Sequence, residues 1–280
     1  MINLLITSPS GYAQRLLQAF EDDEKMQASL LGESRCFHPV SKPMILTEVA
    51  IGTPQFRNFI HQLASYDYLA FSSRKSIEAF ALGLEKEKVQ LPATVGLCAI
   101  GKDNEMLRKA LQVEPAFVSN EPSPMGIVRH LATEVPDSKG KQIAVLAPQV
   151  VGMSEPPIVP DFIHGLEQIG MHPHRVNVYQ TQAASRETLE ATASQILHDD
   201  YDAVVFTSGT EIKVFLQMIP DTMSAEDFLQ HLTVICYGPY TARCAADYGV
   251  KVDFVSPAYG SFQELVSEIR KYYQTNTVHP

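Results

Sequence analysis

The sequence predicts an α/β protein that contains two flavodoxin-like domains, each built on a parallel sheet. Three observations support this fold class: short apolar strands alternate with amphipathic helices, two strand–helix segments occur twice, and small polar turns follow the expected strands. Continuous apolar strands between helices are typical of a parallel sheet that is covered on both faces. Short right-handed crossovers then give a doubly wound layout in each half.

Each expected element follows from a local hydrophobic pattern. Residues 1–170 are expected to contain strands at 1–7, 66–72, 95–101 and 141–148, followed by helices at 12–22, 75–84, 104–113 and 159–170. The second half continues the alternation, with strands at 201–208 and 233–238 and helices at 210–219 and 240–249. Strand-like pieces at 115–118 and 252–255 precede further turns and helices, at 123–135 and 256–273.

The composition is that of an acidic globular protein. The chain has 280 residues, a formal net charge of −10 and 45% hydrophobic residues. This excludes a disordered chain, and the acidic balance argues against nucleic acid or anionic membranes as partners. No apolar run approaches the roughly 18–20 residues that cross a bilayer, and residues 1–11 are typical of a strand rather than a signal peptide. We therefore expect a soluble cytoplasmic protein.

The sequence lacks the common cofactor, metal and nucleophile motifs. It has no GxGxxG after a strand, no GxxxxGK[ST], no HExxH and no GxSxG. His172 and His174 flank a proline in what we interpret as a turn, where exposed histidines are commoner than metal ligands. The four cysteines form no CxxC pair, so we expect reduced thiols rather than disulfides or a metal site. Neither a cofactor nor a metal is expected.

Two segments of the chain occur twice. Residues 66–80 (YDYLAFSSRKSIEAF) align with residues 201–215 (YDAVVFTSGTEIKVF), 135 positions later, and residues 95–111 match residues 232–249. Each copy contains an apolar strand, a small polar turn and an amphipathic helix. The repetition indicates two similar halves rather than one large domain.

Small polar residues fill the turns after five of the expected strands. Ligands of doubly wound sheets sit at the carboxyl ends of the strands, where helix N-termini point their amides. Such turns hold carboxylates or phosphates without a net positive charge, although Ser, Thr and Asn there also serve as ordinary N-caps. The candidate ligand-binding residues are Thr7, Ser72, Ser73, Lys102, Asn104, Thr207, Ser208, Gly209, Thr210, Gly238, Tyr240 and Thr241.

Four stretches carry a recognisable combination of motifs: YDYLAFSSRKSIEAF (66–80), VNVYQT (176–181), YDAVVFTSGTEIKVF (201–215) and VICYGPYTARCAADYG (234–249). In this order they resemble the uroporphyrinogen-III synthase family over nearly the whole chain. The last stretch is similar to the family's strand-G-x-x-T-A pattern and is the most specific. Two turns depart from the family, because Ser8 stands where Arg is common and Asn104 stands at a Thr position.

The resemblance also implies how the chain divides into domains. The family exchanges its first strand–helix unit, which implies one domain of residues 1–38 and 181–280 and a second of residues 39–180. Two antiparallel linker strands, around CFHPV (36–40) and VNVYQT (176–181), would join them. Such a double linker is a hinge, and a flexible cleft between the domains would follow.

The same resemblance implies a lyase of tetrapyrrole biosynthesis, on the route to heme, sirohaem, chlorophyll and cobalamin. The substrate would be hydroxymethylbilane, a linear tetrapyrrole, which is cyclised to uroporphyrinogen III with inversion of the terminal D ring and loss of water. No cofactor is implied. Tyr179, in the VNVYQT motif, is the candidate acid that assists departure of the hydroxyl, and Thr241 is a candidate carboxylate ligand. We expect a monomer whose partner is this small molecule.

Two other classes of protein are weighed against this interpretation. A non-catalytic two-domain binding protein for an anionic small molecule shares the paired sheets and cleft, and its periplasmic form ordinarily carries an export signal that residues 1–11 do not resemble. A tandem receiver-like module needs a phosphoacceptor Asp after a strand. Asp67 and Asp202 instead precede their expected strands, which disfavours a receiver.

Overall fold

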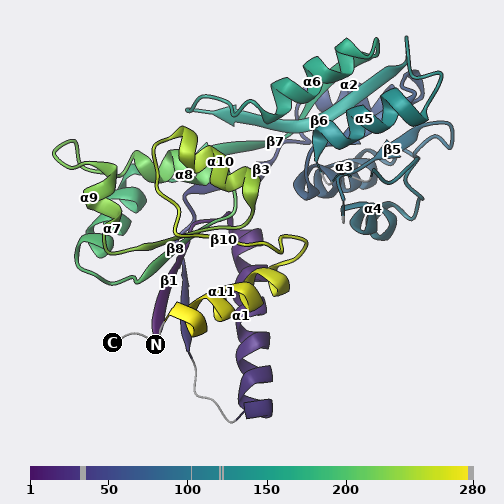
Figure 1. Ribbon diagram of the computed structural model, residues 1–280. Coiled ribbons are helices and arrows are strands. Elements are labelled where there is room, and N and C mark those ends of the chain that lie inside the picture. The colour runs from purple at the N-terminus through teal and green to yellow at the C-terminus, as the bar shows by residue number, and fades with distance from the viewer. Residues whose placement is uncertain (32–35, 102, 120, 122, 277–280) are drawn as a thin grey trace. The chain divides into compact units, whose positions relative to one another are not determined.

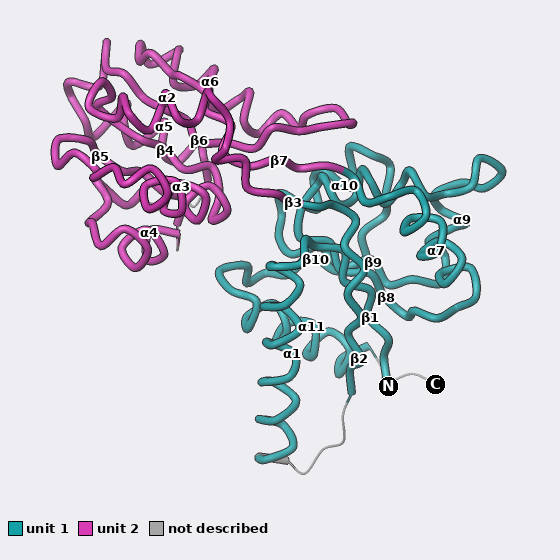
Figure 2. The backbone as a smooth tube through the Cα atoms, turned by 180° about the vertical axis from the view of Figure 1, so that it is seen from behind, with its two compact units in different colours: residues 1–46, 183–280 teal, residues 47–182 magenta. Residues whose placement is uncertain are grey.

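The computed structural model describes residues 1–31, 36–101, 103–119, 121 and 123–276. The chain forms two compact units, which Figure 2 shows in different colours. Unit 1 consists of Met1–Leu46 and Ala183–Pro280, and unit 2 consists of Thr47–Gln182. The chain therefore passes between the units twice. The boundaries that the family resemblance implies are 38/39 and 180/181.

Unit 1 is built on a five-stranded parallel sheet with the strand order β10-β9-β8-β1-β2. Read from β2, this is the 2-1-3-4-5 order of a flavodoxin-like sheet. Its elements are β1 (Ile2–Ile6), α1 (Ser10–Leu31), β2 (Phe37–Ser41), α7 (Arg186–Leu197), β8 (Ala203–Phe206), α8 (Gly209–Leu216), α9 (Ala225–Leu229), β9 (Thr233–Cys236), α10 (Pro239–Asp247), β10 (Phe254–Val255) and α11 (Phe262–Asn276).

Helices cover both faces of the unit 1 sheet. Leu4 and Ile6 of β1 pack against α1 and α11 in one apolar cluster. On the other face, the rings of Phe206 in β8 and Phe215 in α8 lie 5.1 Å apart. Figure 1 shows α8 and α10 on the opposite side of the sheet from α1 and α11. The continuous apolar strands expected from the sequence are therefore buried on both faces.

Unit 2 has the strand order β3-β7-β6-β4-β5, in which β5, β4, β6 and β7 run parallel. Helices α2, α3 and α4 cover one face of this sheet, and α5 and α6 cover the other. Its elements are β3 (Ile45–Val49), α2 (Pro54–His61), a 3-10 turn (Leu63–Ser65), β4 (Tyr68–Phe71), α3 (Arg74–Glu87), β5 (Gly96–Cys98), α4 (Asp103–Leu111), α5 (Pro124–Glu134), β6 (Gln142–Val151), α6 (Ile158–Gln168) and β7 (His172–Ala183). The α/β fold class with two flavodoxin-like, largely parallel sheets is thus confirmed.

The two units share one topology in a permuted chain order. β4-α3-β5-α4 of unit 2 corresponds to β8-α8-β9-α10 of unit 1, as the sequence repeat indicates. β6-α6-β7, which closes unit 2, then corresponds to β1-α1-β2, which opens the chain. The repeated aspartates support this match: Asp67 accepts a hydrogen bond from Gln142 N at 2.8 Å, and Asp202 accepts one from Asn3 N at 2.7 Å. Each aspartate therefore ties together the amino ends of two neighbouring strands.

Three local expectations from the sequence are wrong. Residues 36–40 are not a linker strand, because β2 lies inside unit 1 and pairs in parallel with β1. The strand next to β7 is β3: Ala50 N donates to Val178 O and Ala184 N donates to Met44 O, an antiparallel pattern. The second wrong expectation is the strand at 115–118. These residues form no strand, although Ala116 N donates to Leu97 O.

The third error concerns His172 and His174, which lie in β7 rather than in a turn. His174 stacks on the ring of Tyr66, and its Nδ1 contacts the Tyr66 hydroxyl. Both histidines are exposed, as expected. In the described part of the chain, no helix is long and apolar enough to cross a membrane.

Candidate functional site at the carboxyl edges of the two sheets

In unit 1, three of the polar turns meet at the carboxyl edge of the sheet. Thr7 follows β1, Thr207 and Ser208 follow β8, and the turn that begins α10 follows β9. Thr7 is fully buried, and Thr241, in the first turn of α10, is 4% exposed. The Thr241 hydroxyl donates to Thr207 O at 3.2 Å. These residues, expected from the sequence, are thus brought together within one unit.

A buried carboxyl group that the sequence analysis missed lies at the centre of this cluster. Glu211, in the first turn of α8, is 1% exposed. Its Oε2 accepts from Thr7 Oγ1 and Thr207 N, both at 2.8 Å. Its Oε1 accepts from Thr207 Oγ1 at 2.6 Å and Ser208 Oγ at 2.9 Å. The available signal was the Ser208-x-x-Glu211 spacing, which is that of a capping box.

Burial and hydrogen bonding act on Glu211 in opposite directions. Desolvation raises the pKa of its carboxyl group, whereas the bonds from Thr207, Thr7 and Ser208 lower it, and the net shift of the pKa is upward. The carboxyl also acts on a neighbour: burial first, and then the negative charges of Glu211 and Cys244, raise the pKa of Cys236 to about 12. Cys236 is therefore an inert thiol at neutral pH.

Two glycines of the same edge lie at close contacts. A Cβ atom on Gly209 would lie 2.7 Å from Cβ and Sγ of Cys244, so α8 and α10 approach closely only without a side chain there. Gly238 is the N-cap of α10, and a Cβ there would lie 3.1 Å from the Tyr259 ring. Tyr240, next in this turn, is 49% exposed. Because Gly238 is the N-cap, Thr241 is not the cap of α10. Its hydroxyl donates instead to Thr207 O, just after the end of β8.

In unit 2, Tyr179 and Ser73 are brought together. The Tyr179 hydroxyl lies 3.0 Å from Ser73 Oγ, and Ser73 is the N-cap of α3, where it accepts from Ser76 N. The Tyr179 side chain is 7% exposed and belongs to the apolar cluster under α3. Ser72 donates to Leu146 O at 2.9 Å. Both serines thus hold the turn together as well as facing the strand ends.

The turn after β5 carries a different set of groups. Asn104 is 2% exposed and donates through Nδ2 to Ala99 O at 3.2 Å and Gly101 O at 2.9 Å. Arg74, which the sequence analysis did not single out, donates to Asp103 at 2.5 Å and so joins the starts of α3 and α4. Lys102, also a predicted ligand-binding residue, lies outside the described residues. Thr210 is half-buried in the first turn of α8.

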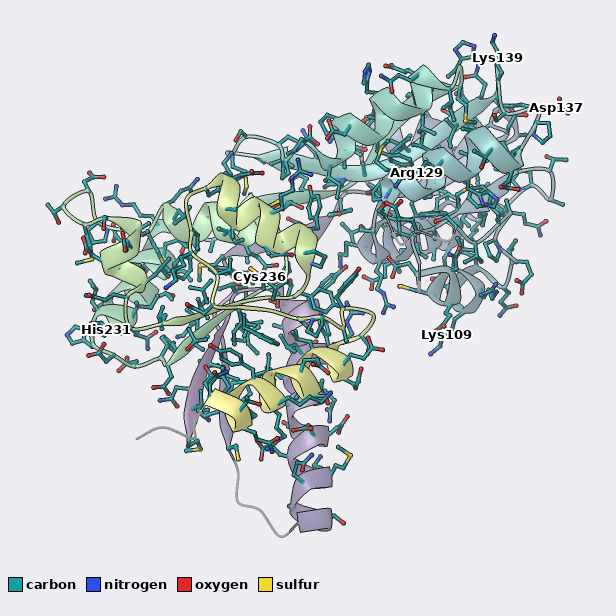
Figure 3. All side chains as sticks on the ribbon, viewed as in Figure 1. Lys109, Arg129, Asp137, Lys139, His231 and Cys236 are labelled. Atoms are coloured by element: carbon teal, nitrogen blue, oxygen red, sulfur yellow. The ribbon has the colours of Figure 1, made fainter. Side chains whose placement is uncertain are left out.

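A cavity lies elsewhere, at the amino edge of the unit 1 sheet. It is lined by the residues before β9 and β10, among them Glu226, His231, Lys251 and Asp253. Figure 3 shows His231 at the outer edge of unit 1 and Cys236, at the other end of β9, in its interior. Ligands of doubly wound sheets bind at the carboxyl ends of the strands, so we assign the candidate site to the turns and not to this cavity.

The polar groups of the site are hydroxyls, amides and isolated carboxyls. Among the described residues, no group of three or more His, Cys, Asp or Glu side chains is arranged to hold a metal ion. The four cysteines are free thiols. In unit 1 the side-chain donors of the site are the hydroxyls of Thr7, Thr207, Ser208 and Thr241, and hydroxyl and amide donors suit acidic groups of a ligand.

These features define a two-unit α/β protein with doubly wound sheets and polar turns at their carboxyl edges. The family described as "Uroporphyrinogen-III synthase HemD" matches residues 24–263, and the chain belongs to this family. The resemblance seen in the sequence is thereby confirmed.

Solved structures and a curated protein are similar to this chain. A mutant uroporphyrinogen III synthase from the extremely thermophilic bacterium Thermus thermophilus is 17% identical, covers 97% of this chain and 100% of its own, and has a TM-score of 0.62. The wild-type enzyme in another crystal form gives 17% identity, coverage of 97% and 99%, and a TM-score of 0.49. "Uncharacterized protein YjjA" of Bacillus subtilis (strain 168) is 22% identical over 245 residues, 84% of this chain and 86% of that protein. The first structural likeness shows the shared fold.

Proposed function

We propose that this protein is a uroporphyrinogen-III synthase, a cytoplasmic lyase that converts hydroxymethylbilane to uroporphyrinogen III. The observation that carries the proposal is the family match over residues 24–263. The carboxyl edges of both sheets support it, because their turns supply hydroxyls and amides for an acidic linear tetrapyrrole. The reaction as proposed requires no metal, no nucleotide and no protein partner.

The chemistry begins with loss of the terminal hydroxyl group. The C–O bond breaks, the departing hydroxide takes a proton to become water, and an azafulvene cation remains. The D ring then attacks through its substituted carbon, and the spiro intermediate breaks and closes again with this ring inverted. A proton leaves the ring carbon at the end. Free hydroxymethylbilane also cyclises without inversion. The main role of the protein is therefore to hold the two ends of the linear tetrapyrrole so that the D ring attacks through its substituted carbon.

Two residues receive roles in this proposal. Tyr179 supplies the proton to the departing hydroxide, and its bond to Ser73 fixes the position of the phenol. A phenol is a modest general acid, worth about 10²-fold in rate. Thr241, through its backbone amide at the start of α10, takes a carboxylate of the substrate.

The test is a cyclisation assay with freshly prepared hydroxymethylbilane. Products are oxidised and the uroporphyrin isomers I and III are separated by chromatography, with a protein-free sample as the control for spontaneous closure. We expect isomer III as the main product, at a rate that a chelator does not change. Isomer I alone contradicts the proposal. Tight binding of hydroxymethylbilane without isomer III supports the non-catalytic binding protein instead.

A further inference from the structure

The turn between β8 and α8 surrounds a side chain of the protein itself, the carboxyl group of Glu211. Three hydroxyls and one amide, all within 2.6–2.9 Å, converge on the carboxyl group of Glu211. They belong to Thr7, Thr207 and Ser208, which are three of the residues of this edge that were expected from the sequence to bind an anionic ligand. The ligand-like group that these donors hold is therefore part of the protein itself.

The hydrogen-bonding capacity of these donors is used up. The amide of Thr207 and the hydroxyls of Thr207 and Ser208 each have one proton, and each points at Glu211. Thr7 divides its single proton between Glu211 and Val205 O, at 2.8 and 2.9 Å. A second acidic group that approached these donors would compete with Glu211 for them, and an ionised Glu211 would repel it.

The fold does not require a carboxyl group at this position. The equivalent residue of the repeat in unit 2 is Ser76, 135 positions earlier. Its hydroxyl donates to Ser73 O at 2.6 Å and accepts from Ser73 N at 3.2 Å, which closes a capping box. Helix α3 therefore begins at the same kind of turn without an acidic side chain. The carboxyl group of Glu211 is an addition specific to unit 1.

We propose that the Glu211 carboxyl group takes the place of a ligand anion in the β8–α8 turn, so that this turn excludes the acidic groups of the substrate. This replaces the expectation from the sequence that Thr7, Thr207 and Ser208 bind the ligand directly. The consequence for a tetrapyrrole rests on the proposed function: in unit 1 its carboxylates are held by the turn at α10 and not by the β8–α8 turn. Glu211 is thus a positioning residue that also restricts where acidic groups bind.

The experiment asks whether removal of the carboxyl group opens an anion site. Glu211→Ser introduces the residue type of the equivalent position in unit 2, Ser76. Glu211→Gln keeps the size of the side chain without its charge. Glu187→Ser is the matched control, since Glu187 is an exposed glutamate in the first turn of α7. Each protein is titrated with inorganic phosphate while the backbone amides of Thr207, Ser208 and Gly209 are followed by NMR. Thermal unfolding verifies that each variant is folded.

We expect saturable shifts of these amides in Glu211→Ser, with an apparent Kd at least tenfold lower than in the wild type, Glu211→Gln or Glu187→Ser. Equal responses of wild type and Glu211→Ser overturn the proposal, whether both bind phosphate at this turn or neither does. If Glu211→Ser does not fold, the titration of the wild type decides. Saturable shifts of the Thr207 and Ser208 amides in the wild type overturn the proposal. The absence of such shifts supports it. Since phosphate replaces hydroxymethylbilane in this experiment, its outcome is independent of the isomer assay.

Discussion

The hydroxyl oxygens of Tyr179 and Ser73 lie 3.0 Å apart because β7 contains a bulge. The register of β7 against β6 shifts between Ala147 and Pro148, where Val178 is the extra residue. Val178 and Tyr179 consequently both face the apolar cluster under α3, although neighbours in a regular strand face opposite sides. The bulge re-aims Tyr179 toward the helix start that Ser73 caps.

Tyr179→Phe tests the proposed acid, because it removes the hydroxyl and keeps the buried ring. We expect kcat for uroporphyrinogen III formation to fall by about 10²-fold with KM little changed. The unfolding free energy should fall by only about 1 kcal/mol, the worth of one hydrogen bond. Steady-state kinetics and urea unfolding measure the two effects.

Tyr66→Phe is the control for this change, since Tyr66 is another unit 2 tyrosine whose hydroxyl contacts a side chain, His174. It should lose stability at most and retain the wild-type rate. If Tyr179→Phe also retains nearly the full rate and still forms isomer III, Tyr179 is not the acid, and positioning of the substrate accounts for the catalysis.

Thr241→Ala removes the hydroxyl that bonds Thr207 O and disturbs the first turn of α10. We expect the unfolding free energy to fall by about 1 kcal/mol, because the half-buried Thr207 carbonyl loses this donor. The value of kcat/KM should fall about tenfold, mainly through KM, as a carboxylate contact weakens. Thr241→Ser should restore both quantities. Lower stability with unchanged kinetics would leave Thr241 with a purely structural role.

Glu211→Gln tests the pH dependence of stability. The pKa of Glu211 in the folded protein lies above its ordinary value of 4.5, so the folded state holds its proton to higher pH than the unfolded state does. The contribution of this group to the unfolding free energy therefore falls as pH rises from about 4.5 through the folded pKa. The unfolding free energy of the wild type minus that of Glu211→Gln should decrease over this pH range in urea titrations. An increase with pH would mean that the four donors outweigh burial.

Gly209→Ala tests the close approach of α8 and α10. An added Cβ would lie 2.7 Å from Cys244, which is too close for real atoms, so we expect a loss of about 1–3 kcal/mol of unfolding free energy. Gly11→Ala is the control, because Gly11 lies in α1 with no atom within 4 Å of an added Cβ. It should gain about 0.4–1 kcal/mol. Calorimetric melting distinguishes the two, and equal effects would contradict the packing argument.

Most of the alternation of strands and helices in the repeated segments could be predicted from the sequence, because it depends on local hydrophobic period and on Ser N-caps. Ser73 and Ser208, for example, both begin their helices as expected. The helices α2 and α7 and the edge strand β3 were not predicted. β3 has no period of its own that identifies it as a strand, and its place next to β7 depends on hydrogen bonds to residues about 130 positions away.

Part of the candidate site could also be predicted, because some of its residues are marked by local sequence features. Residue type and position after a strand pointed to Thr7, Thr207 and Thr241, and the structure brings them together in unit 1. Glu211 was missed because a glutamate in the first turn of a helix is ordinarily exposed. Its burial follows only when β1, β8 and α8 are assembled around it.

The sequence by itself determined the α/β class, the repeat and the family, since these are carried by the order of residues along the chain. The tertiary structure decided which pieces are neighbours: it placed β1 beside β8, made unit 1 a permuted form of unit 2, and turned Tyr179 toward Ser73 through one bulge. These relationships depend on pairing between distant strands. Local periodicity specifies that a strand forms and which of its faces is apolar, but it does not specify the partner or the register.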